Sequence, residues 1–213
     1  MYLMNARLLW LFLSGLIYIS CNTATPVKEP VANLQDGEYF AAQVRDGNLV
    51  LRLGNDITSN MLAQLNLKDK RFSHIGICFI ENGAKMVYHS LGSEYGAHNY
   101  LRKDSLAVFF NLADNLSIGY ARANLDAGTT QRIHDTLEQW YQKQIPFDMD
   151  FDWSSDDKMY CSEMVAKAIM RGNKAIHIPV TDTLGRQYYA IDNILNALTL
   201  DTLAYYSRSL RKL

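Results

Sequence analysis

The segment FSHIGICFIENGAKMVYHS, residues 72 to 90, contains two runs rich in β-branched and aromatic residues on either side of Asn82-Gly83. Asn-Gly is favoured at the centre of a two-residue type I′ turn, in which both central residues adopt a positive φ. The segment is therefore predicted to be a β-hairpin whose paired residue numbers sum to 165, which places Cys78 opposite Val87.

The register of this hairpin brings two histidines to one face of the sheet. Side chains alternate along a strand, so His74 and Gly76 share a face with His89, and Gly76 lies opposite His89 where a side chain would crowd the ring. His74 and His89 are diagonal neighbours with Cα atoms about 7–8 Å apart, within reach of a hydrogen bond between imidazoles. A single strand histidine is usually structural, whereas an adjacent pair over a glycine indicates a functional site. No role is assigned to the other histidines, His98, His134 and His177.

The rest of the chain indicates an α+β fold. Strands are expected at 48–54, 106–110 and 117–122, and helices at 56–67, 129–144, 161–172 and 188–198, with Gly172 as the C-terminal cap of the third. Strands clustered in the middle of the chain, without alternating helices, favour an antiparallel sheet packed on helices.

Cys161 precedes an apolar helical stripe in MYCSEMV, residues 159 to 165, and three interpretations apply. Cysteine is often buried in cores. At a helix N-terminus it can instead be a nucleophile, because the free N–H groups and a nearby imidazole lower its pKa. In that case its own backbone N–H is the natural oxyanion donor. With His74 and His89 it could also form a zinc site, although no paired-ligand spacing supports this.

The aspartate-rich loop at 147–158 has Asp148, Asp150 and Asp152 at the spacing of calcium ligands. The glycine and the closing glutamate of an EF-hand loop are replaced by Trp153 and Met159, which excludes that site. The loop is expected to form a charged rim or an ordered cap beside Cys161. No metal and no cofactor are predicted.

The motifs FSHIGI and, some seventy residues later, PFD…DDKMYCSEMV together resemble the YiiX/YaeF-like proteins over roughly residues 45 to 200. These are circularly permuted papain-fold relatives of the NlpC-type amidases, in which the histidine strand precedes the cysteine helix. The resemblance implies a permuted papain-like fold with Cys161 as nucleophile, His74 as general base and His89 as the third, orienting residue. A carboxylate is often expected at this third position, although histidine also occurs in NlpC-type enzymes.

The activity implied by the resemblance is acyl transfer through a thioester at Cys161. Cell-envelope peptides or amides are the first expected substrates. Permuted papain-like proteins are also similar to lecithin retinol acyltransferase-like enzymes, so an acyl-lipid substrate is the alternative. A third possibility is a non-catalytic lipid-binding lipoprotein of the same fold.

The N-terminus has the pattern of an export signal. Arg7 precedes an apolar run from Leu8 to Ile19, too short to span a bilayer, and YISC at 18–21 resembles a lipobox with Tyr18 in place of the usual Leu. Residues 1–21 are predicted to be the signal peptide with Cys21 as the lipid attachment site, 22–40 a polar tether and 41–213 the hydrolase domain. The protein is thus expected to be an exported, membrane-anchored lipoprotein facing the periplasm or the cell surface. A net charge of −1 shows no excess of basic residues of the kind that binds nucleic acid, so no nucleic-acid partner is expected.

Overall fold

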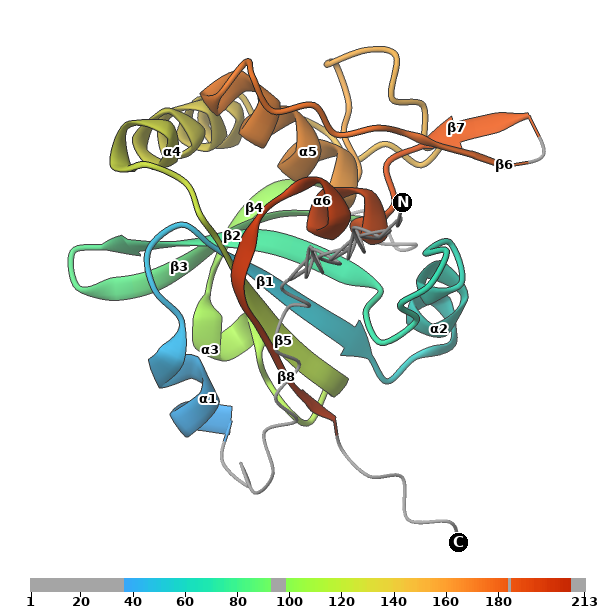
Figure 1. The fold of residues 1–213 in the computed structure, drawn as a ribbon. Helices are drawn as coiled ribbons and strands as arrows, with labels where there is room; N and C mark the ends of the chain where they lie inside the picture. The colour runs from blue at the N-terminus through green and yellow to red at the C-terminus, as the bar shows by residue number, and fades with distance from the viewer. Residues whose placement is uncertain (1–36, 93–98, 184, 208–213) are drawn as a thin grey trace, which may run out of the picture.

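The computed structural model describes residues 37–92, 99–183 and 185–207. The predicted signal peptide, Cys21, most of the tether and His98 lie outside the described residues. In chain order the elements are α1 (Gly37–Gln43), β1 (Asn48–Gly54), α2 (Ile57–Ala63), β2 (His74–Glu81), β3 (Ala84–Leu91), β4 (Tyr100–Ser105), α3 (Leu106–Phe109), β5 (Asn115–Ala123), α4 (Ala127–Gln142), α5 (Cys161–Gly172), β6 (Thr181–Thr183), β7 (Arg186–Tyr188), α6 (Ile191–Ala197) and β8 (Leu200–Ser207) (Figure 1).

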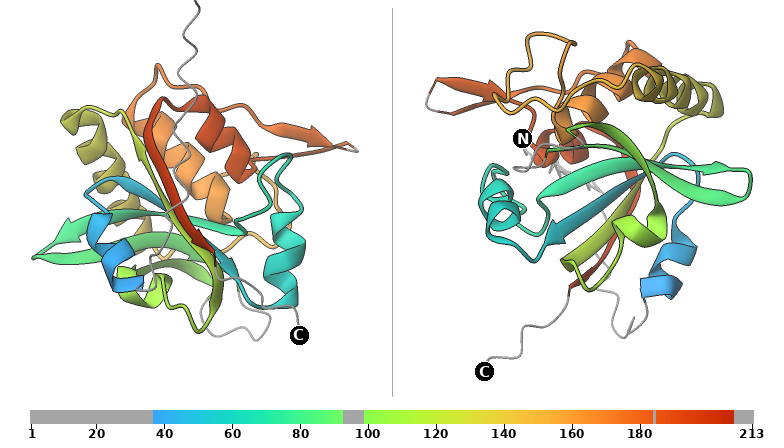
Figure 2. Two further views of the ribbon diagram at one scale, coloured as in Figure 1. Left: turned by 60° about the horizontal axis from the view of Figure 1, so that its bottom comes forward. Right: turned by 180° about the vertical axis from the view of Figure 1, so that it is seen from behind.

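The larger sheet has the strand order β4-β3-β2-β1-β5-β8, and every neighbouring pair is antiparallel. Helices α4, α5 and α6 cover one face, and α1 and α3 lie on the other (Figures 1 and 2). The α+β fold with an antiparallel sheet packed on helices is as predicted.

Strand alternation divides the interior into two cores. Ile75, Ile77 and Phe79 face the core under α4, α5 and α6. Cys78 and Val87 belong to the second core, toward α1 and α3. Burial raises the pKa of the Cys78 thiol to about 12, so this cysteine is a packed structural residue.

The predicted hairpin register is confirmed, since Cys78 pairs with Val87 and Ile80 with Lys85. Asn82 and Gly83 both adopt positive φ, at 50° and 82°, as a type I′ turn requires.

The expected strand at 106–110 is wrong, because residues 106–109 form α3 and the preceding residues form β4. The hydroxyl of Ser105 accepts a hydrogen bond from the backbone N–H of Val108 and so caps this short helix. Leu106 and Phe109 are buried while Val108 is exposed, which is helical rather than strand spacing. The strands β6, β7 and β8 were also not predicted.

The remaining expected elements form with shifted ends. Strand β1 has its predicted bounds, α2 is shorter than the predicted 56–67, and α4 begins and ends two residues early. Gly172 is the last residue of α5 rather than a cap beyond its end. A Cβ atom there would lie 2.5 Å from Cγ1 of Ile133, so this glycine allows α4 and α5 to pack closely.

Helix α1 begins within the expected tether. Its Phe40 is buried in the second core, so residues 37–40 pack on the domain. None of the helices in the described ranges is long and apolar enough to span a membrane.

Candidate active site

Cys161 is the first residue of α5, and hydrogen bonds on both sides hold it in place. The carboxylate of Glu163 accepts a hydrogen bond from the backbone N–H of Tyr160 at 3.2 Å, so this N–H group at the helix start has an acceptor. The hydroxyl of Ser162 donates to the carbonyl of Tyr189 at 2.6 Å, and the N–H of Tyr189 donates to the hydroxyl of Tyr160 at 2.7 Å. The segment before α6 is thereby fastened to the N-terminus of α5.

The pKa of the Cys161 thiol is raised, because burial disfavours the thiolate. The backbone N–H groups of Ile75 and Ser162 and the positive charge of Arg52 act in the opposite direction but do not outweigh burial. The sequence-based expectation of a lowered pKa took account of the helix N-terminus and a nearby imidazole but not of burial, and it is wrong for the protein without substrate. At neutral pH the thiol is protonated.

The two predicted imidazoles are in contact. Nε2 of His74 lies 2.9 Å from Nδ1 of His89, and the rings are almost perpendicular. Both are buried, at 7% and 2% exposure, and burial lowers the pKa of both imidazoles, that of His74 to well below its usual value. The predicted neighbourhood of His74 and His89 is confirmed, and both rings are neutral at neutral pH.

A carboxylate that the sequence analysis missed completes this row of side chains. Oδ2 of Asp104 lies 3.0 Å from Nε2 of His89, and Arg102 forms an ion pair with the same carboxylate at 2.9 Å. Asp104 pairs with Val87 in the sheet and so shares the histidine face. It could have been found only if β4 had been placed at 100–105.

Arg52 is the second residue that was missed. It pairs with His74 across β1 and β2, and its guanidinium lies over the ring of Phe109, 5.2 Å from the centroid. Its Nη1 donates to Asn115 at 3.3 Å. Its positive charge acts to lower the pKa of the Cys161 thiol, against the larger effect of burial, and so favours the thiolate. The same charge helps to lower the pKa of the His74 imidazole and so keeps the base unprotonated.

Cys161 and His74 line one cavity of about 170 Å³, although the hydrogen bond of His74 runs to His89 rather than to the sulfur. Most of its wall is apolar. The apolar side chains come from α2 and the turn after it, the end of β3, the aspartate-rich loop and the start of α6: Leu62, Leu65, Leu91, Phe147, Met149, Phe151 and Ile191.

Gly76 keeps space for His89, as predicted. A Cβ atom there would lie 2.7 Å from Cγ1 of Val87, 2.8 Å from the carbonyl of Tyr88 and 3.1 Å from Cβ of His89. Gly76→Ala is expected to lower the free energy of unfolding by about 1–3 kcal/mol, the usual effect of overpacking. Urea denaturation measures this change.

The control for this substitution is Gly128→Ala. Gly128 lies in the first turn of α4, where a Cβ atom would meet only the ends of the Asp126 and Arg132 side chains. This variant is expected to be as stable as the wild type or slightly more stable. Equal stability of the two variants would contradict the assigned role of Gly76.

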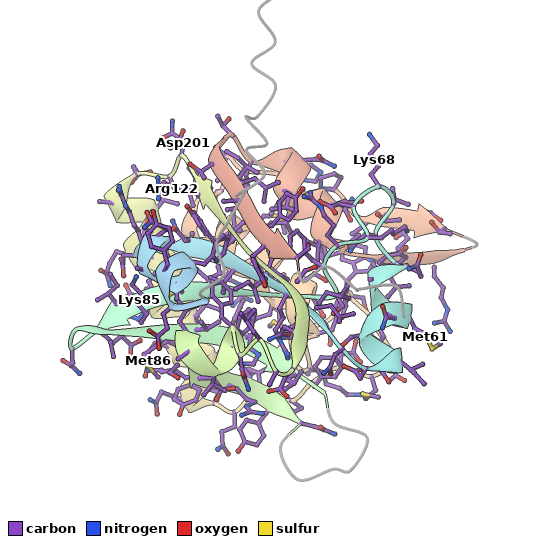
Figure 3. The ribbon with its side chains drawn as sticks, turned by 90° about the horizontal axis from the view of Figure 1, so that it is seen from below. Met61, Lys68, Lys85, Met86, Arg122 and Asp201 are labelled. Atoms are coloured by element: carbon purple, nitrogen blue, oxygen red, sulfur yellow. The ribbon has the colours of Figure 1, made fainter. Side chains whose placement is uncertain are left out.

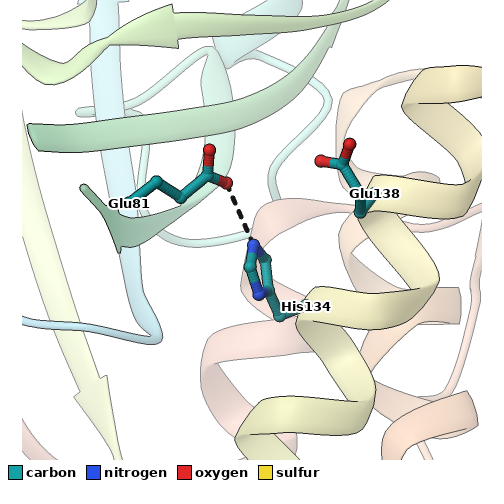
Figure 4. Close-up of side chains that lie close together, drawn as sticks. All are labelled: Glu81, His134 and Glu138. Atoms are coloured by element: carbon teal, nitrogen blue, oxygen red, sulfur yellow. Dashed lines mark hydrogen bonds and ion pairs between the residues drawn. The ribbon is translucent and has the colours of Figure 1, made fainter.

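The side chains of Glu81, His134 and Glu138 bring three potential metal ligands within 4.8 Å of one another, the one such group in the described part of the chain (Figure 4). Nζ of Lys103 lies 3.1 Å from Glu81 and 2.7 Å from Glu138, and the hydroxyl of Tyr88 also contacts both carboxylates. The lysine already supplies the positive charge, so this group does not fit a metal ion. Cys161, His74 and His89, the zinc set considered as an alternative and not predicted, do not bring their ligand atoms together in this way.

The aspartate-rich loop is an ordered cap, one of its two expected forms. Asp148 is buried, and its two carboxylate oxygens accept the backbone N–H groups of Asp150 at 2.9 Å and Asp152 at 2.6 Å. These bonds shape the loop segment that carries Phe147, Met149 and Phe151 to the cavity.

Comparisons with known proteins agree with the fold. A family model described as permuted papain-like amidase enzyme, YaeF/YiiX, C92 family, matches residues 43–204. Among solved structures, the chain is similar to one described as the metalloprotein YiiX of Escherichia coli O157:H7, with a TM-score of 0.59 and 17% identity. The match covers 78% of this chain and 98% of that one, and at this identity it shows a shared fold. No curated protein sequence matches the chain.

Proposed function

The chain belongs to the permuted papain-like amidase family of the YaeF/YiiX type, and on this premise we propose that it is a cysteine-dependent hydrolase that cleaves amide bonds by acyl transfer to Cys161. One observation carries the proposal. Cys161 and His74, 87 residues apart in the chain (161 − 74), line the same cavity, and His74 is hydrogen-bonded to His89. A nucleophile, a base and a group that orients the base are the parts that nucleophilic catalysis requires.

The protonation states favour general-base catalysis over a preformed ion pair. Since the Cys161 thiol and the His74 imidazole are both neutral, His74 takes the thiol proton as sulfur attacks the carbonyl carbon. The mechanism requires the sulfur and the imidazole to come within hydrogen-bond distance when substrate binds, as is common for catalytic hydrogen bonds. His74 then gives the proton to the leaving nitrogen, and water hydrolyses the thioester with His74 as base. The backbone N–H of Cys161, at the first helical position, has no acceptor within the helix and suits the oxyanion.

The apolar cavity favours a substrate with an apolar acyl group beside the scissile bond. Leu62, Phe147 and Ile191 contribute to its wall. On the same helix as Leu62, the side chains of Ile57 and Met61 are 81% and 68% exposed. Figure 3 labels Met61 on this helix. An open polar cleft would suit a cell-envelope peptide, whereas this wall suits an acyl-lipid amide. Within the proposed function, amides with a long acyl chain are therefore the preferred substrates. Peptides or amides of the cell envelope are the second candidate.

Export and membrane attachment through Cys21 form the second part of the proposal. The lipobox-like YISC and the apolar run before it support this location, which would place the active site next to lipid substrates. Mass spectrometry of the N-terminus tests it. A chain that still begins at Met1, or a mature chain that begins at an unmodified Cys21, would contradict lipid attachment.

No metal-dependent step is proposed. YiiX is described as a metalloprotein. In this chain, however, the one cluster of ligands among the described residues already contains the ammonium group of Lys103.

Trapping of the thioester tests the proposed function. Amides of the same amine with a short or a long acyl chain are incubated with the protein, and the cysteine-containing peptides are analysed by mass spectrometry. The acyl group is expected on Cys161 and not on the buried Cys78, with more adduct from the long chain. Binding of the long-chain amide without turnover and without adduct would instead identify a non-catalytic lipid-binding protein.

A further inference from the structure

A continuous row of hydrogen bonds leads from a carboxylate near the surface to the proposed base. Asp104, with 21% of its side chain exposed, lies 3.0 Å from Nε2 of His89, and Nδ1 of His89 lies 2.9 Å from Nε2 of His74. Both imidazoles are buried, so each ring nitrogen in this row has a defined partner rather than water.

The position of each proton follows from the groups at the ends of the row. The carboxylate of Asp104 has a lowered pKa, because it is hydrogen-bonded to His89 and paired with Arg102, so it is ionised and can only accept. Nε2 of His89 must then carry the proton. A neutral imidazole has one N–H, so Nδ1 of His89 is an acceptor and Nε2 of His74 is the donor between the rings.

The same count leaves Nδ1 of His74 without a proton. We propose that Asp104 is a positioning residue that fixes the tautomers of both imidazoles, so that Nδ1 of His74 is the atom that removes the proton from Cys161. This inference rests on the proposed function. It adds Asp104 to the proposed set of Cys161, His74 and His89 as a residue that acts through His89 and does not touch the substrate.

The proton balance is complete within this set. When the S–H bond of Cys161 breaks and the S–C bond forms, the proton moves to Nδ1 of His74, which becomes an imidazolium. The proton passes to the leaving nitrogen as the C–N bond breaks. His89 and Asp104 hold the other protons in place throughout, and the negative charge of Asp104 stabilises the transient positive charge through His89.

Without the carboxylate, the opposite arrangement becomes available. If His89 carries its proton on Nδ1, it donates to Nε2 of His74, and the single proton of His74 then lies on Nδ1. In that tautomer His74 has no lone pair for the thiol. Asp104→Asn removes the charge and presents a donor as well as an acceptor, so it permits this second arrangement.

Nitrogen NMR of protein labelled at histidine tests the inference directly. In the Cys161→Ala protein, His74 and His89 are both expected to show a protonated Nε2 and an unprotonated Nδ1. Asp104→Asn in the same background is expected to populate the reverse tautomers. An unchanged tautomer in Asp104→Asn, or a protonated Nδ1 of His74 before the change, would overturn the proposal. This readout does not require activity, so it remains informative even if the proposed hydrolase function fails.

Enzyme kinetics of variants that retain Cys161 give the second readout. Asp104→Asn is expected to lower kcat about 10- to 100-fold, the range found when outer partners that orient histidines are removed, with KM little changed. Asp104→Glu keeps a carboxylate and is expected to recover part of kcat. Arg102→Met is the matched control, because it removes the ion pair and leaves the bond from Asp104 to His89. An equal loss in Arg102→Met would assign the effect to the ion pair and overturn the proposal.

Discussion

Cys161→Ala is expected to reduce amide hydrolysis to the background rate, a loss on the order of 10⁶-fold as for other enzymes that lose their nucleophile. Without the sulfur no thioester can form, and the neutral His74 has no thiol to deprotonate. The fold should persist, because the thiol lies at the start of α5 against the cavity and the bonds of Ser162 and Tyr160 that fasten the helix remain. Steady-state rates with the long-chain amide measure the loss, and circular dichroism verifies the fold.

Cys78→Ala is the matched control for this substitution. Cys78 is the second free thiol among the described residues and is fully buried in the core toward α1 and α3. Its loss should lower stability and leave the rate per folded molecule unchanged. If Cys161→Ala retained the wild-type rate, or if Cys78→Ala lost it to the same extent, Cys161 would not be the nucleophile.

His74→Gln is expected to reduce kcat/KM by about 10²- to 10⁴-fold, the usual contribution of a general base. Glutamine can still hydrogen-bond to His89, but its amide cannot take up the thiol proton. In the wild type, the base must be unprotonated, and burial together with the charge of Arg52 holds the pKa of His74 well below its usual 6.5. Activity should therefore remain constant as the pH falls to 6.5 and decline only well below it. A decline centred at or above pH 6.5 would contradict the assignment.

The same lowered pKa affects stability. The unfolded chain binds a proton at His74 below about pH 6.5 while the folded protein does not, so the free energy of unfolding falls as the pH drops below that value. His74→Gln should weaken this dependence, which urea denaturation at several pH values measures. His134→Gln is the control for the kinetic effect of His74→Gln, since His134 is half-buried beside Glu81 and does not line the cavity. This variant is expected to leave kcat/KM unchanged.

The hairpin and its two histidines could be predicted because their determinants are local. Asn82 and Gly83 specify the turn, the turn specifies the register, and the register places His74 beside His89. The same holds for Cys161, whose place at a helix start follows from the apolar stripe after it. These features need only neighbouring residues and the geometry of strands and helices.

Strand β4 shows where local reasoning fails. The segment YLRKDS at 100–105 contains three consecutive charged residues and no apolar alternation, whereas LAVFF at 106–110 has strong strand propensity. The first forms a strand because β3 supplies its hydrogen-bonding partners, and the second forms a helix because Ser105 caps it. Asp104 was missed for this reason, since its position opposite Val87 exists only once β4 pairs with β3.

The sequence by itself therefore determined the hairpin register, the pair of imidazoles and the order in which histidine strand and cysteine helix follow each other. Only the tertiary structure decided that Asp104 and Arg52 join them and that the cavity wall is apolar. It also reversed the expected direction of the thiol pKa. The physical reason is the range of the interactions. Turn and strand geometry act between near neighbours, whereas burial and the approach of charges from distant strands depend on the packed fold.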